Sequence, residues 1–120
     1  MGGTNQQIGQ YGEKLACDYL RRHGYKILRT NYKASHQELD IIAEQGDFVV
    51  FVEVKTRTSF VYGDGTEAVE WKKQASLRKA ITQYLIKEQP PCSDVRADLI
   101  TVFIDKIRKT ARIKHYEDIL

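Results

Sequence analysis

Apolar side chains recur at helical spacing near the start of the chain. The pattern predicts a helix with one apolar stripe, formed by Ile8, Tyr11, Leu15, Ala16, Tyr19 and Leu20. Thr4-x-x-Gln7 has the spacing of a capping box, so we expect this helix to begin near Asn5. Gly24 is typical of the residue just beyond a helix, which predicts an end after His23.

The rest of the chain carries strand patterns and one further helix. Strands are expected at residues 25–29, 38–44, 48–57, 98–104 and 111–116, and a long helix from about residue 66 to 87, before Pro90-Pro91. Residues 30–37 are expected to form a polar loop, and Gln45-Gly46-Asp47 a turn. The order αβββαββ predicts a single α/β domain over residues 1–120, a sandwich with a central mixed β-sheet flanked by helices.

The segment Phe48–Arg57 is the strongest strand pattern of the chain. Its nearly continuous apolar run predicts a place in the middle of the sheet, covered on both faces. Alternation puts Glu53 and Lys55 on one face and Val50, Val52 and Val54 on the other. Burying the two charges costs several kcal/mol unless they are paired or bind an ion. Glu53 and Lys55 therefore form either a structural ion pair or a functional site.

The preceding strand adds carboxylates to the same face. With a two-residue turn at Gln45-Gly46, Asp40 would lie opposite Phe51, and Glu38 opposite Glu53. Diagonal neighbours are about 7–8 Å apart at the backbone, so Asp40 and Glu53 could reach one ion, Mg²⁺ or Mn²⁺. Such an ion polarises a phosphate oxygen and lowers the pKa of a bound water. Lys55 could orient that water or stabilise developing negative charge.

Composition narrows the class of protein only slightly. The chain of 120 residues is 42% hydrophobic and 29% charged, with a formal net charge of +3, a weak indication of an anionic partner. No apolar run approaches the roughly 20 residues of a membrane helix, and residues 1–7 lack the features of a signal peptide. The spacing of Cys17 and Cys92 fits neither a disulfide framework nor a zinc site. Cys17 is expected on the side of the first helix that faces away from the centre of the apolar stripe, without a functional role. We expect a cytoplasmic protein without a membrane partner.

A set of short motifs resembles the YraN-like family of uncharacterised bacterial proteins, from about residue 8 to residue 101. The motifs are Gly9-x-x-Gly12-Glu13-x-x-Ala16, Tyr19-Leu20, Gly24-Tyr25, Asn31-Tyr32, Glu38-Leu39-Asp40-Ile41-Ile42 and Phe51-Val52-Glu53-Val54-Lys55-Thr56-Arg57. That family is placed in the restriction-endonuclease-like PD-(D/E)XK superfamily, beside archaeal Holliday-junction resolvases and RecB-type nucleases. Gln37 departs from the family pattern, which usually has Gly at this position.

The resemblance implies roles for individual residues. Asp40 and Glu53 would be metal ligands and Lys55 the catalytic lysine. Glu13 would be a further catalytic acid on the first helix, although without the resemblance it would be taken as a surface charge. The small residues beside it would let that helix approach the sheet closely.

Other residues are candidates with an ordinary structural alternative. Glu38 either contacts the metal ligands or is a solvated acid at a strand edge. Lys73 and Gln74 fall on the buried arc of the long helix, where RecB-type nucleases use a glutamine; Gln74 either contacts the site or is a partly buried polar residue. Arg57 is a candidate nucleic-acid contact. Phe60 and Tyr62 either stack on unpaired bases or pack the loop that contains them.

The residues themselves predict hydrolysis of phosphodiester bonds, with Mg²⁺ or Mn²⁺ as cofactor. The resemblance implies that the substrate is DNA, in branched or single-stranded form, and that the protein is a homodimer, because junction-cutting members of the superfamily cut two strands symmetrically. Two alternatives belong to other classes of protein. One is a nucleic-acid-binding or scaffold protein that retains the nuclease fold without turnover, and the other is a structural protein with a buried charge network.

Overall fold

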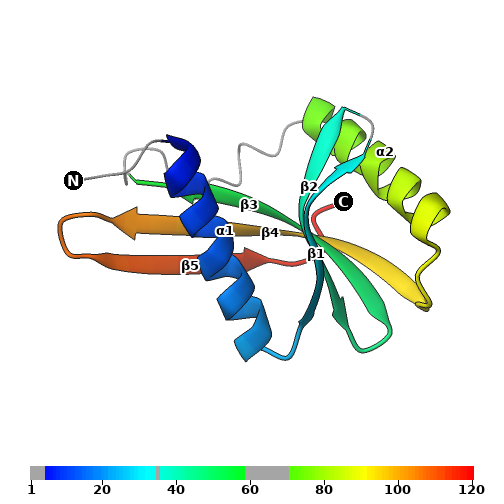
Figure 1. Ribbon diagram of the computed structural model, residues 1–120, viewed down its shortest axis with the longest axis horizontal. Helices are drawn as coiled ribbons and strands as arrows, with labels where there is room; N and C mark the ends of the chain where they lie inside the picture. Colours follow the sequence, from blue (N-terminus) through cyan, green and yellow to red (C-terminus); the bar gives the residue numbers. More distant parts are fainter. Residues whose placement is uncertain (1–4, 35, 59–70) are drawn as a thin grey trace.

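The computed structural model describes residues 5–34, 36–58 and 71–120, with side chains from residue 74 onward in the second helix. Its elements in chain order are α1 (Asn5–Arg22), β1 (Lys26–Ala34), β2 (Gln37–Gln45), β3 (Phe48–Arg57), α2 (Trp71–Glu88), β4 (Asp94–Asp105) and β5 (Thr110–Tyr116). The strands form a sheet in the order β1-β2-β3-β4-β5 (Figure 1), in which β3 and β4 are parallel and the other pairs antiparallel. The expected αβββαββ order and mixed sheet are confirmed. Neither described helix is long and apolar enough to cross a membrane.

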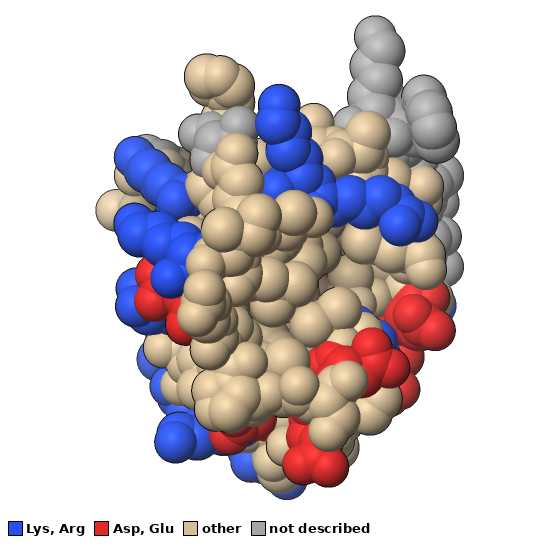
Figure 2. Space-filling view, turned by 90° about the vertical axis from the view of Figure 1, so that its right-hand side faces the viewer, with Lys and Arg blue, Asp and Glu red and all other residues tan. Residues whose placement is uncertain are grey.

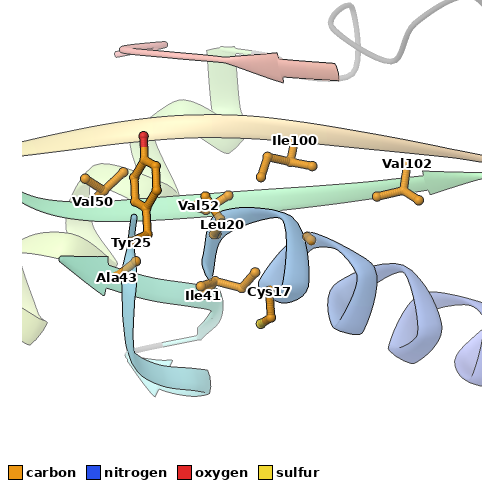
Figure 3. Packing of buried hydrophobic residues seen from close by; sticks show 10 residues of the cluster. Cys17, Leu20, Tyr25, Ile41, Ala43, Val50, Val52, Ile100 and Val102 are labelled. Carbon is orange, nitrogen blue, oxygen red and sulfur yellow. The ribbon is translucent and has the colours of Figure 1, made fainter. Parts of the chain in front are cut away.

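The two helices pack on opposite faces of the sheet, and β3 lies at its centre as expected. The cluster under α1 contains Ala16, Cys17, Leu20, Tyr25, Ile41, Ala43, Val50, Val52, Ile100 and Val102 (Figure 3). The cluster under α2 contains Ala34, Leu39, Ile42, Val49, Phe51, Leu77, Ala80, Ile81, Tyr84 and Ala97. The expectation for Cys17 was wrong, because this side chain is 7% exposed and belongs to the core under α1.

Strands β1 and β2 occupy part of the segment expected to be a polar loop. The ladder continues to Lys33–Glu38 and Ala34–Gln37, so the loop predicted at residues 30–37 is wrong. The segment reads as polar because β1 is an edge strand with mostly exposed or half-buried side chains. The helix predicted from about residue 66 is described from Trp71, and residues 66–70 lie outside the described part of the chain.

The turn between β2 and β3 sets a register different from the predicted one. Gln45 pairs with Phe48, so Gly46 and Asp47 form the turn, and Ile42 rather than Asp40 lies opposite Phe51. Gly46 has a φ of 56°, which suits the first central position of a two-residue hairpin turn. The pairing is shifted by two residues from the expected one. Since side chains alternate with a period of two, the shift alone moves no residue to the other face.

Helix α1 approaches β3 very closely at Gly12. A Cβ atom at this position would lie 2.9 Å from Thr56 Cβ and closer still to Thr56 Oγ1. Gly9, one turn earlier, would meet nothing within 4 Å. The expected close approach of the helix is therefore confirmed at Gly12 and does not depend on Gly9.

A buried carboxylate joins β4, β5 and the residues after β5. Asp98 is fully buried, and its oxygens accept hydrogen bonds from Arg96 Nε and Nη2 at 2.9 and 3.0 Å and from the Asp118 amide at 3.0 Å. His115 Nε2 lies 2.7 Å from Asp98 Oδ2. Burial acts to raise the pKa of the Asp98 carboxyl, but the hydrogen bonds from His115, Arg96 and Asp118 outweigh it, so the pKa lies below its ordinary value. Asp98 is therefore an ionised structural group.

Replacing Asp98 with Asn should destabilise the protein by about 3–5 kcal/mol at neutral pH, because Arg96 would keep its partly buried charge without a carboxylate. The pKa of the Asp98 carboxyl is lower in the folded protein than its value of about 3.9 in the unfolded chain, so the ionised carboxylate stabilises the fold above about pH 4. This stabilisation is lost as the pH falls through the folded-state pKa. The wild type should thus lose more stability below about pH 4 than Asp98→Asn does. Urea unfolding at several pH values measures both effects, with exposed Asp94→Asn as the control. A loss no larger than that of Asp94→Asn would contradict the assignment.

Gly12→Ala should lower the free energy of unfolding by about 1–3 kcal/mol, because the added methyl group overlaps Thr56. The matched change Gly9→Ala should be neutral or stabilise by up to about 1 kcal/mol, since a helical Ala is favoured over Gly where space is open. Thermal and urea unfolding of the two variants test the difference. Equal stabilities would show that α1 does not approach β3 as closely as described.

Candidate metal-binding site

Strands β2 and β3 separate at one end, and the separation forms a fork in the sheet. Their ladder stops at the pair Ile41–Val52. Beyond it, residues 37–40 of β2 remain beside β1, whereas residues 53–57 of β3 remain beside β4. Asp40 is the first residue on the β2 arm of this fork, and Glu53 is the first on the β3 arm. An acidic residue thus stands on each arm directly after the last backbone pair.

The alternation of side chains changes at the fork. Leu39 and Ile42 both pack in the cluster under α2, although strict alternation would put them on opposite faces. Asp40 lines a cleft with residues of α1, on the same side of the sheet as Ile41. The neighbouring residue of β1, Asn31, has a left-handed φ of 51°. Asn31 donates a hydrogen bond to Glu13 of α1, and Asp40 lines the cleft with residues of α1, a placement that strict alternation along β2 does not predict.

Three carboxylates gather on this side of the fork. Ligand oxygens of Glu13, Glu38 and Asp40 lie within 4.8 Å of one another. Glu13 and Asp40 are half-buried, and Glu38 is exposed. Glu13 and Asp40 border a cleft of about 260 Å³ whose described lining is Asn5, Ile8, Gly9, Glu13, Asp40, Val54, Thr56 and Thr58. Three carboxylates at this separation repel one another, and an oxygen-ligand site of this kind could hold a divalent cation.

Hydrogen bonds orient two sides of the cluster. The Asn31 Nδ2 group donates to Glu13 Oε1 at 2.9 Å and to Glu38 Oε1 at 3.2 Å. The Val54 amide donates to Asp40 Oδ2 at 2.9 Å. A carboxylate offers about four lone-pair sites, so these bonds leave each group able to ligate an ion. The cluster is therefore held by α1, β1, β2 and β3 together.

Glu53 and Lys55 lie on the face of β3 that packs toward α2. Val49 and Phe51 belong to the cluster under α2, and Glu53 and Lys55 follow them at the strand period. Glu53 is 6% exposed, and Lys55 is half-buried. The expected division of β3 into two faces is confirmed, but Glu38 and Asp40 were expected on the Glu53 face and lie on the other. The Val54 amide, which follows Glu53 directly in the chain, donates to Asp40 Oδ2, so the Asp40 carboxylate lies beside the peptide group that joins Glu53 to Val54.

The remaining candidates have different positions. Arg57, at the end of β3, is half-buried, and its Nη1 donates to the Thr56 carbonyl at 3.3 Å. Gln74 is half-buried in the first turn of α2 and is not among the described residues that line the cleft. Phe60, Tyr62 and the side chain of Lys73 lie outside the described part of the chain.

The contribution of Asn31 to this site does not follow from the sequence pattern. The pattern predicts a polar loop at this residue, whereas Asn31 belongs to β1 and bridges two carboxylates. One signal was available, because Asn is among the few residues that adopt left-handed backbone angles at low cost. Its side-chain amide also matches acceptor-only carboxylates.

Comparison with known proteins places these residues in a defined family. The model of the "Uncharacterised protein family UPF0102" matches residues 12–102. A UPF0102 protein from Alkaliphilus oremlandii is 41% identical over 114 residues, which is 95% of this chain and 97% of that protein. One from Caldicellulosiruptor bescii is 40% identical over 115 residues, covering 94% and 96% of the two chains. One from Dictyoglomus thermophilum is 37% identical over 106 residues, covering 88% and 90%. The matched region includes Glu13, Glu38, Asp40, Glu53 and Lys55, and the chain belongs to the UPF0102 family.

Proposed function

We propose that this protein is a nuclease that hydrolyses phosphodiester bonds in DNA with Mg²⁺ or Mn²⁺ bound at the fork between β2 and β3. The observation that carries the proposal is the gathering of Glu13, Glu38 and Asp40, whose ligand oxygens lie within 4.8 Å of one another. They come from a helix and a strand that are separated in sequence. Three carboxylates this close together cost free energy unless positive charge compensates them.

The donor set fits a hard divalent cation. Mg²⁺ and Mn²⁺ prefer oxygen ligands, and Mg²⁺ usually takes one or two carboxylates, water and substrate phosphate. Asp40 is the best-placed ligand, because the Val54 amide fixes its Oδ2 at the base of the cleft. Glu13 and Glu38 would complete the set, with Asn31 holding their orientation. When bound, the ion would polarise a phosphate oxygen and lower the pKa of a coordinated water.

Glu53 and Lys55 complete the proposed catalytic group from the β3 arm. Glu53 is nearly buried at the point where the two strands separate, and a buried carboxylate is usually paired or bound to an ion. We assign it to the metal site together with Asp40, and Lys55 to stabilising the charge that develops on the phosphate. The resemblance to PD-(D/E)XK nucleases supports the same three residues, and it alone suggests branched or single-stranded DNA.

Binding of Mg²⁺ or Mn²⁺ should stabilise the wild type, by about 2.7 kcal/mol at a free ion concentration one hundred times the dissociation constant. Asp40→Asn should abolish this stabilisation, because the amide keeps an acceptor for Val54 and loses the charge. Thermal unfolding and titration calorimetry with each ion measure the effect. Glu44→Gln is the matched control, since Glu44 lies on the same strand outside the cluster. Equal stabilisation of Asp40→Asn and Glu44→Gln would place the ion elsewhere.

Purified protein should cleave at least one member of a panel of linear, single-stranded, flapped and four-way DNAs when Mn²⁺ or Mg²⁺ is present. Asp40→Asn, Glu53→Gln and Lys55→Ala should each lower the rate by about 100-fold or more, because each removes a charge at the reacting phosphate. Lys33→Ala, an exposed cation of β1, is the control for loss of a lysine.

Two results would count against the proposal. Cleavage that survives in all three site variants would come from another site or from a contaminant. DNA binding in chelator without cleavage of any substrate would favour the alternative of a nucleic-acid-binding protein without turnover.

A further inference from the structure

The edge of the sheet formed by β5 carries a concentration of positive charge. Five of the nine residues from 106 to 114 are Lys or Arg, and none is acidic. All five cations are exposed. Of these, Lys106, Lys109, Arg112 and Lys114 form no salt bridge with any residue in the described ranges, and Arg108 only approaches Asp105, at 3.9 Å. By contrast, Lys14 and Arg21 of α1 are both paired with Asp18.

Strand register connects this charge to the β3 arm of the fork. Arg57 of β3 pairs with Phe103 of β4, which pairs with Arg112 of β5. Two residues before Arg57, Lys55 of β3 pairs with Thr101 of β4, which pairs with Lys114 of β5. Partners in neighbouring strands share a face, so Arg112 and Lys114 project from the same face as Arg57 and Lys55, two strand spacings or roughly 10 Å away.

The shape of the molecule presents this surface at one end. The β4–β5 hairpin projects beside the end of β3 and the N-terminal half of α1 (Figure 1). The opposite end, which faces the viewer in Figure 2, carries both signs, with Lys and Arg across its upper part and down its left side and Asp and Glu mainly over its lower part. The hairpin segment 106–114 has five cations and no acidic residue, so it should attract a polyanion more strongly than this mixed surface does.

We propose that Arg57, Arg112, Lys114 and the hairpin residues Lys106 and Lys109 form a basic track that binds the phosphate backbone of nucleic acid. The choice of nucleic acid rests on the proposed nuclease function, because the track starts beside Lys55. The track extends the DNA contact from the end of β3, across β4, to the edge strand. Its cations contact phosphates and not bases, so it binds without sequence preference.

The test compares DNA affinity over a range of salt concentrations, measured by fluorescence anisotropy of labelled duplex and four-way DNA in chelator. Arg112→Ala/Lys114→Ala should weaken binding to both DNAs and reduce the slope of log affinity against log salt by about 2, roughly one per lost phosphate contact. Lys26→Ala/Lys87→Ala is the matched control, because it removes two exposed cations at the start of β1 and the end of α2. This control should keep the wild-type slope.

Further measurements distinguish a failure of the basic track from a failure of the proposed nuclease function. Asp40→Asn should bind DNA in chelator at least as tightly as the wild type whether or not the wild type cleaves it, since it removes negative charge from the cleft. Equal slopes for the wild type and both double variants would overturn the basic track, even if metal-dependent cleavage is found.

Ile107, which is 93% exposed at the hairpin tip, could also enter a lipid surface. Binding to phosphatidylserine vesicles without binding to DNA would overturn the assignment to nucleic acid.

Discussion

Helix α1 lies so close to β3 at Gly12 that a single added methyl group would overlap Thr56. This contact holds the helix close against the middle of the sheet, where Ala16 and Leu20 are fully buried. It also decides where the next residue lies, because Glu13 follows Gly12 and borders the cleft at the fork. A larger residue at position 12 would move the helix outward and carry Glu13 away from Asp40. Core packing and the geometry of the acidic cluster therefore depend on the same close approach.

The protein uses buried and half-buried carboxylates in two different ways. Asp98 is fully buried, and Arg96, His115 and the Asp118 amide surround it with hydrogen bonds that favour its charge. Glu13 and Asp40 are half-buried at a cleft, where they accept hydrogen bonds that include one from the neutral Asn31 amide side chain and one from the Val54 backbone amide. The first arrangement encloses a charge among its partners. The second places carboxylate oxygens beside a cleft that an ion could enter.

The distribution of charge links the two proposals. An acidic cleft without an ion would repel DNA, whereas the exposed cations of β5 would attract it. A bound divalent ion would reverse the sign of the local field and make the cleft compatible with a phosphate. Under this scheme, the basic track would bring the backbone to the hairpin end of the sheet, and the ion would draw one phosphate into the fork.

The sequence by itself determined the elements whose patterns are local. The helical stripe of α1, the apolar run of β3 and the αβββαββ order all follow from the spacing of apolar residues, and Asp40, Glu53 and Lys55 stood out as charges in apolar segments. Glu13 became a candidate only through the family resemblance. Tertiary structure decided the register of β2 on β3, because the turn moved by one residue and shifted every pair by two. It also decided which acids meet. Side-chain alternation breaks in β2 between Leu39 and Ile42, so Asp40 lies on the α1 side with Glu13 instead of on the Glu53 face, and Glu38 joins them. Periodicity assumes a regular backbone, and such an irregularity is stable only because residues distant in sequence hold it through hydrogen bonds.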